Sequence, residues 1–212
     1  MRASIKLTFL MAFLFLFSGC AIKKSPDMLP EEARLAVAGF FQPKHSWQLL
    51  AGYVRDDRQP VPGNVLADLD NSLANSLIKY GREDYVRPPF VRQCREIILQ
   101  ETGRSRVSAL KYWIRVGQCI PADFILVPTI LEMRARKGGE WGVKEPAAVV
   151  MDIYLIDVQN ERMRRYHFDE VQKSISENIL EAKKFIRRSG KWLTAKQLAM
   201  DGIEQGVVEL GL

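Results

Sequence analysis

The stretch that decides the fold is Ala147–Val158, AAVVMDIYLIDV, followed by Arg162–Glu170, RMRRYHFDE. Both segments are rich in the β-branched and aromatic residues that strands prefer. The residues between them, Gln159-Asn160-Glu161, are typical of a turn. We therefore predict two consecutive strands with a short connection, which pair in antiparallel fashion.

A third strand is predicted just before this pair. Asp123–Met133, DFILVPTILEM, is strongly apolar, and a polar, glycine-bearing loop at residues 134–146 separates it from Ala147. Three consecutive strands with short connections indicate an antiparallel three-stranded meander.

The remaining body contains helical and extended segments. Continuous apolar runs predict a buried first strand at Arg34–Phe41 and a further extended piece at Trp47–Val54. Apolar residues three and four positions apart predict helices at Pro62–Gly81, Phe90–Thr102, Ser105–Val116, Glu177–Arg188 and Thr194–Leu210. We expect Gly117 to close the third of these helices. The fold class is therefore α+β, with an α/β mixed sheet and covering helices, in one globular domain at residues 33–212.

The N-terminus carries the features of an export signal. Arg2 and Lys6 precede an apolar run from Leu7 to Phe17. This run is shorter than the roughly 20 residues that a membrane-spanning helix needs, but it suits the apolar part of a secretory signal. Two small residues, Ser18 and Gly19, then stand directly before Cys20.

This arrangement resembles the lipobox of bacterial lipoproteins, although Phe17 occupies the position where Leu is usual. The resemblance implies that residues 1–19 are a cleaved signal peptide, that Cys20 carries acyl chains such as palmitate, and that residues 20–32 are a tether. It places the protein on the periplasmic face of the cell membrane or the outer membrane, and Ala21 in place of Asp favours the outer one. The alternatives are a signal peptide cut elsewhere, or an uncleaved anchor with an incidental cysteine.

Composition limits the partners. The hydrophobic content is 47% and the formal net charge is +6, from which loss of the signal removes the charges of Arg2 and Lys6. A mildly basic chain without aromatic-interleaved basic tracts does not point to nucleic acid.

Cys94 and Cys119 follow Cys20, and an exported chain meets an oxidising compartment, so we predict that they form a disulfide. The alternative is two buried thiols too far apart to pair. We expect no metal and no cofactor, because the chain has no CxxC motif and its two histidines, His45 and His167, lack a ligand spacing.

The second half is similar to a group of uncharacterised bacterial lipoproteins. The shared residues are a strand, the loop RKGGEWGVKEPA at 136–147, a second strand, and the segment YHFDEVQKSISEN at 166–178. The order of elements also resembles the TolB N-terminal-domain fold, which several envelope assembly lipoproteins use. This resemblance implies a non-catalytic envelope protein.

Three features are candidates for function. His167, Asp169 and Glu170 suggest an acid–base site, but strand alternation separates His167 and Asp169 from Phe168 and Glu170. Trp141, in a glycine-bearing loop, is a candidate interface anchor or a cap on the core edge. A basic cluster suits either a solvated helix end or an anionic lipid or polymer, and it comprises Lys183, Lys184, Arg187, Arg188 and Lys191.

The sequence thus favours a lipid-anchored envelope protein that is not an enzyme. We expect it to act as an accessory or assembly factor through contacts with an envelope protein partner. The alternatives are an envelope hydrolase that uses the His167 region, and a binder of anionic lipid or peptidoglycan through the basic cluster.

Overall fold

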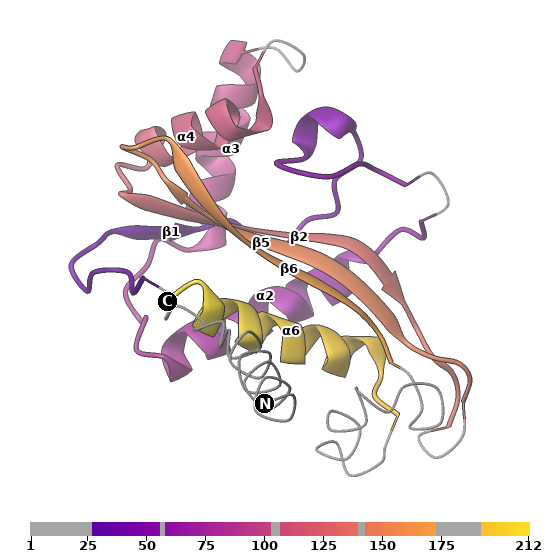
Figure 1. Cartoon of the computed structure of the whole chain (residues 1–212). Helices are drawn as coiled ribbons and strands as arrows, with labels where there is room; N and C mark the ends of the chain where they lie inside the picture. The colour runs from indigo at the N-terminus through magenta and orange to yellow at the C-terminus, as the bar shows by residue number, and fades with distance from the viewer. Residues whose placement is uncertain (1–26, 56–57, 103–106, 140–142, 173–191) are drawn as a thin grey trace, which may run out of the picture.

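The computed structural model describes residues 27–55, 58–102, 107–139, 143–172 and 192–212, and it arranges them around a mixed four-stranded sheet (Figure 1). The strands of this sheet are β1 (Leu35–Val37), β2 (Phe124–Arg134), β5 (Ala148–Asp157) and β6 (Arg162–Val171). The other described elements are α2 (Gly63–Lys79), α3 (Pro88–Thr102), α4 (Ala109–Cys119), α6 (Ala195–Glu209), the 3₁₀ turn η1 (Ser46–Gln48), β3 (Lys137–Gly138) and β4 (Val143–Glu145). The protein therefore has the α+β fold with a mixed sheet that the sequence predicts.

The sheet has the strand order β1-β2-β5-β6. β1 runs parallel to β2, whereas β2, β5 and β6 pair in antiparallel fashion. The predicted three-stranded meander is thus confirmed. The loop predicted at residues 134–146 contains the small β3–β4 hairpin.

Helices cover both faces of the sheet, with α2 and α6 on one side and α3 and α4 on the other (Figure 1). Because successive side chains of a strand point to opposite faces, β5 contributes to two separate cores. Ile153 and Leu155 pack with α2 and α6. Tyr154 and Ile156 pack with α3 and α4.

Two glycines let α6 lie close against the sheet. A Cβ atom at Gly202 would lie 2.8 Å from Phe168 Cγ, and one at Gly206 would lie 2.7 Å from Tyr166 Cδ1. The other flank of α6 is tied to α2 by two exposed ion pairs, Lys196–Asp68 at 2.8 Å and Lys79–Glu204 at 2.5 Å.

The predicted disulfide is present and joins α3 to α4. Cys94 and Cys119 are bonded, with their Cα atoms 5.9 Å apart. The expectation that Gly117 closes α4 is wrong, because the helix continues through Gly117 to Cys119. A Cβ atom at position 117 would lie 2.5 Å from Val158 Cγ2. The lack of a side chain at Gly117 therefore allows α4 to pack close to the sheet. The helix also begins later than predicted, after the N-cap Ser108.

The extended piece predicted at Trp47–Val54 is wrong as well. This segment begins in η1, and residues 49–55 form no strand. Its apolar residues Leu50 and Ala51 pack on the α3–α4 core from a loop. Burial of a loop therefore produced the same apolar run as a strand.

The first strand is shorter than its apolar run, because the chain leaves the regular ladder after Val37. The carboxylate of Asp70 accepts the backbone N–H of Phe40 at 2.6 Å. The chain then returns to β2, where Ile130 N–H donates to the Phe41 carbonyl at 3.0 Å.

The described chain enters the fold beside its C-terminus. Leu29 is buried, and its N–H donates to the Gly211 carbonyl at 2.8 Å. The side chain of Arg82 bonds the carbonyls of Leu29 and Pro30. Arg164 Nη1 donates to the Asp27 carbonyl at 2.5 Å, which fixes this entry point next to β6. Among the described residues, no helix is both long enough and apolar enough to cross a membrane.

Candidate functional site on the open part of the sheet

Polar side chains gather on the face of β5 and β6 that α3 and α4 leave open. Asp152, in the middle of β5, is fully buried. Its carboxylate accepts hydrogen bonds from Tyr154 Oη at 2.9 Å and from Arg165 Nε and Nη2 at 2.8 and 3.1 Å. His167 Nδ1 lies 2.7 Å from Asp152 Oδ1. These four residues are called the Asp152 cluster below.

The cluster follows from the pairing of two strands. The β5–β6 register places Asp152 opposite His167 and Tyr154 opposite Arg165. Because alternate residues of a strand share a face, all four side chains leave the sheet on the same side. Phe168 points the other way and is buried under α6, as the predicted alternation requires.

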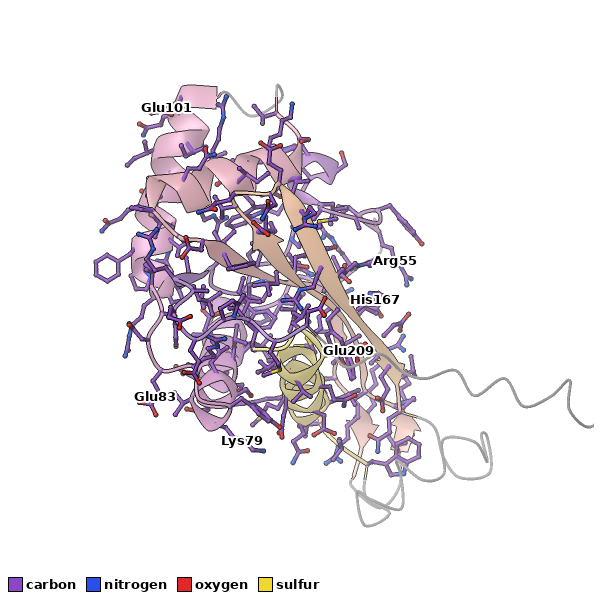
Figure 2. All side chains as sticks on the ribbon, turned by 60° about the vertical axis from the view of Figure 1, so that its left-hand side comes forward. Arg55, Lys79, Glu83, Glu101, His167 and Glu209 are labelled. Atoms are coloured by element: carbon purple, nitrogen blue, oxygen red, sulfur yellow. A yellow bond between two sulfur atoms is a disulfide. The ribbon has the colours of Figure 1, made fainter. Side chains whose placement is uncertain are left out.

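Half of the cluster is accessible from outside. The side chains of Arg165 and His167 are 36% and 43% exposed, whereas the side chain of Asp152 has no exposed surface. In Figure 2, His167 lies on the sheet between the α3–α4 pair above it and α6 below it. A molecule in solution therefore meets the imidazole and the guanidinium but not the carboxylate.

The protonation states in the cluster are mutually consistent. A buried carboxylate costs free energy unless it is paired and hydrogen-bonded. Hydrogen bonding to Asp152 raises the pKa of Arg165, so the guanidinium stays charged. Burial is the larger cause, and the neighbouring Asp152 charge the second, of a Tyr154 pKa well above its ordinary value. The Tyr154 phenol therefore stays protonated and donates to the carboxylate.

His167 and Asp152 have the geometry of a general base with its orienting carboxylate. In the neutral imidazole with its proton on Nδ1, His167 donates to the Asp152 carboxylate and Nε2 is an acceptor, while Arg165 Nη2 lies 3.2 Å from the same Nδ1. In the part of the chain that the structure describes, no hydroxyl or thiol is hydrogen-bonded to His167. Within the described residues, the pair can therefore activate water but has no side-chain nucleophile beside it.

Asp152 and Arg165 were missed as partners of His167 by the sequence reasoning. The signal for them was the turn between the strands. Asp157 and Arg162 are paired beside the turn. Counting the same number of residues away from the turn along each strand reaches Asp152 on β5 and His167 on β6. Alternation within β6 alone does not reveal these partners, because they follow from the register across the hairpin.

The predicted lipid anchor, interface anchor and basic cluster lie outside the described residues. They are Cys20, Trp141 and the basic cluster Lys183, Lys184, Arg187, Arg188 and Lys191. The residues that flank two of these segments lie together. Arg136 Nη1 donates to the Trp192 carbonyl, and Leu193 N–H donates to Gln172 Oε1 at 2.7 Å. The described residues that flank these two segments therefore lie together at one end of the sheet.

An aromatic cavity lies between α3, α4 and the loop after β1. The Arg95 guanidinium lies 5.0 Å from the ring centroids of both Phe41 and Trp113, and its Nε is buried without a hydrogen-bond partner among the described residues. Trp47 and Tyr112 complete the wall. The cavity volume of about 20 Å³ suits one water molecule and is too small for a substrate.

An open hollow of about 290 Å³ lies at the end of the sheet beside the entry of the chain. Two of its carboxylates already have partners. Asp123 bonds Arg34, and Asp157 accepts the backbone and side-chain N–H groups of Asn160. No group of three or more His, Cys, Asp or Glu residues within the described ranges could hold a metal ion.

No protein-family model and no curated protein matches the chain. Several solved structures overlap with it. The PelC dodecamer from Paraburkholderia phytofirmans is 15% identical, with a TM-score of 0.49 over 89% of this chain and 94% of that one. The LpoB C-terminal domain from Salmonella enterica is 14% identical, with a TM-score of 0.39 over 69% of this chain and 88% of that one.

Lipoprotein GNA1162 from Neisseria meningitidis is 13% identical, with a TM-score of 0.36 over 74% of this chain and 98% of that one. With TM-scores below 0.5, these three resemblances assign neither a family nor a function to the chain.

Proposed function

We propose that the protein is a lipid-anchored envelope protein that acts as an accessory or assembly factor through protein contacts. The observation that carries this proposal is the Cys94–Cys119 disulfide. Disulfides persist in oxidising compartments, and the sequence before Cys20 is an export signal of the lipoprotein kind. Two unrelated features of the chain therefore support the same location.

The anchor is the lipid on Cys20. Stable membrane binding takes more than one acyl chain, which a diacylglyceryl group on the thiol supplies. The described fold begins at Asp27, next to β6, so a short tether joins it to Cys20. The domain is therefore held close to the membrane while most of its surface stays available to a partner.

Substitution of Cys20 by Ala tests the anchor. The variant should lose palmitate labelling and move from the membrane fraction to the soluble fraction. Ser25→Ala, which changes the tether and keeps the cysteine, is the matched control and should stay in the membrane. A Cys20→Ala protein that still sediments with membranes would contradict the anchor.

Trp141 is the residue proposed to anchor the partner. Cross-linking of the tagged, membrane-bound protein in its native envelope, followed by mass spectrometry, identifies what it contacts. The Trp141→Ala variant should recover less of that protein. Tyr53 is another loop aromatic, and its side chain is 77% exposed, so Tyr53→Ala is the matched control. Equal recovery with both variants would remove Trp141 from the interface.

A hydrolase is the second candidate, because His167 is oriented by a buried carboxylate at 2.7 Å. The purified protein would then hydrolyse an envelope ester or a peptidoglycan bond by general-base activation of water. His167→Gln should abolish that activity and leave the thermal unfolding transition intact. No turnover of phospholipid or peptidoglycan by the wild-type protein would exclude these two substrate classes.

A further inference from the structure

β6 forms a long outer edge of the sheet. It has 10 residues and stands last in the strand order β1-β2-β5-β6. Within the described residues, no strand pairs with its outer side. The opposite edge differs, because β1 has only 3 residues and Val86 bridges its outer side at Ala36. An open edge of this length is a template for another strand.

The charges along β6 divide into two halves. Arg162, Arg164 and Arg165 occupy its first half, and Asp169 and Glu170 occupy its second half. Charges on an edge strand usually prevent pairing with other strands. Here the charges disfavour pairing with a strand of unrelated sequence. They are complementary to those of a second copy of β6 that runs in the opposite direction.

Self-pairing of β6 has to be antiparallel, because the same edge of each copy meets the other across a two-fold axis. Side chains that lie opposite each other must also share a face of the sheet. With His167 on the axis opposite its own copy, Arg165 lies opposite Asp169 of the second copy. On the other face, Arg164 lies opposite residue 170 of the second copy, but Glu170 is buried in its own chain and adds no charge to the edge.

Neighbouring registers match fewer charges. Moving the axis by one residue to Tyr166 places Arg165 opposite His167 and Asp169 opposite Met163 of the second copy. Moving it to Phe168 places His167 opposite Asp169 and leaves Arg165 opposite Val171. The register centred on His167 is therefore the one that places the exposed acid Asp169 opposite an arginine, and the two-fold axis repeats this Arg165–Asp169 pair.

We propose that the protein forms a two-fold homodimer in which two β6 strands pair in antiparallel fashion and join two four-stranded sheets into one. Main-chain hydrogen bonds along β6 supply the binding, and the Arg165–Asp169 pairs fix the register. His167 lies at the centre of the interface, and Asp152 supports it from the strand behind.

One consequence rests on the proposed lipid anchor. Asp27 lies beside the first half of β6, so the two copies of Asp27 lie towards opposite ends of the joined sheet. The residues from Cys20 to Asp27 span at most about 25 Å. Both tethers reach one leaflet when the two-fold axis lies along the membrane normal. The dimer itself does not depend on the anchor.

Cysteine substitution in the full-length, membrane-bound protein tests the register. The thiol introduced by His167→Cys would face its own copy within disulfide range, because directly opposite Cβ atoms lie about 5 Å apart. Mild oxidation should convert most of the His167→Cys chain to a band of doubled mass that a reductant removes. Asp169→Cys, on the same face, is the matched control and should stay monomeric because its two copies lie about 13 Å apart.

An independent measurement is the mass of the detergent-solubilised protein by analytical ultracentrifugation. The wild-type chain should sediment as a dimer, and Asp169→Arg should halve the protein mass. Asp84→Arg makes the same charge change near the opposite edge of the sheet and should leave the dimer intact. A monomeric wild type, or equal oxidation of the two cysteine variants, overturns the proposal. Loss of membrane binding in Cys20→Ala would not affect either result.

Discussion

Asp152 and His167 lie directly opposite each other on β5 and β6, with Asp152 Oδ1 and His167 Nδ1 2.7 Å apart. The two side chains differ in exposure, since the carboxylate is fully buried and the imidazole is half-exposed. The carboxylate therefore depends on its partners, and the most important of them is Arg165, which bonds both carboxylate oxygens.

Arg165→Gln should be the most destabilising substitution on this face. It leaves a fully buried carboxylate without its permanent cation. We expect a loss of about 2–3 kcal/mol in the free energy of unfolding, below the usual cost of breaking a buried ion pair because Arg165 is partly exposed. Urea unfolding measures the loss. Arg162→Gln removes an exposed arginine 3.9 Å from Asp157 and should be nearly neutral. Equal losses in the two variants would show that the Asp152 cluster does not stabilise the fold.

Gly206→Ala should destabilise the protein despite the higher helix propensity of alanine. Its Cβ atom would lie 2.7 Å from Tyr166 Cδ1 and 2.8 Å from Ile153 Cδ1. Overpacking costs about 1–3 kcal/mol, and the gain in helix propensity offsets about 1 kcal/mol of that. Gly63→Ala, at the start of α2, meets no atom within 4 Å and should be neutral or slightly stabilising. A more stable Gly206→Ala variant would mean that α6 shifts outward at little cost.

Periodicity in the sequence is sufficient to predict the three strands of the meander and the helices α2 and α6. The spacing of Leu69, Leu73 and Leu77 places α2, and Thr194, where the last helix is predicted to begin, is the N-cap of α6. These signals are local, because each depends on residues within one or two turns of the chain. The sequence-based prediction is wrong where the role of a residue is set by a contact with a residue far away in the chain. Gly117 looked like a helix terminator but accommodates Val158.

The candidate site shows the same limit. Alternation placed His167 on a polar face, but its partner Asp152 belongs to another strand. The register of the hairpin was needed to bring the two together. The apolar run at residues 47–54 failed for a related reason, since its burial comes from tertiary packing of a loop and not from pairing in a sheet.

The stability of the protein should depend on pH through Asp70. Burial raises the pKa of the Asp70 carboxyl above its ordinary value of 3.8, although the Phe40 N–H and the Arg92 charge lower it. A raised pKa means that ionisation opposes folding. The contribution of Asp70 is therefore fully favourable below about pH 3.8 and is lost as the pH rises through the raised value.

Asp70→Asn isolates this effect, because the amide oxygen still accepts the Phe40 N–H and the charge is gone. The variant should gain stability relative to the wild type as the pH rises above about 4, with little difference at about pH 3. Asp68→Asn, two residues earlier in α2 and in an exposed pair with Lys196, should show no such gain. Thermal unfolding between these acidic conditions and neutral pH measures both, and a difference that shrinks with rising pH would contradict the role of burial.

Removal of the disulfide should destabilise the α3–α4 layer. The bond closes a loop of 25 residues, for which the chain-entropy model gives about 3 kcal/mol. The paired variant Cys94→Ala, Cys119→Ala should lose an amount of this order in urea unfolding, and reduction of the wild type should lower its stability similarly. Because the double variant has no α3–α4 disulfide to reduce, a reductant should have no effect on its stability. Equal stability of the oxidised wild type and the double variant would mean that the stacking of Arg95 on Trp113 already holds the two helices together.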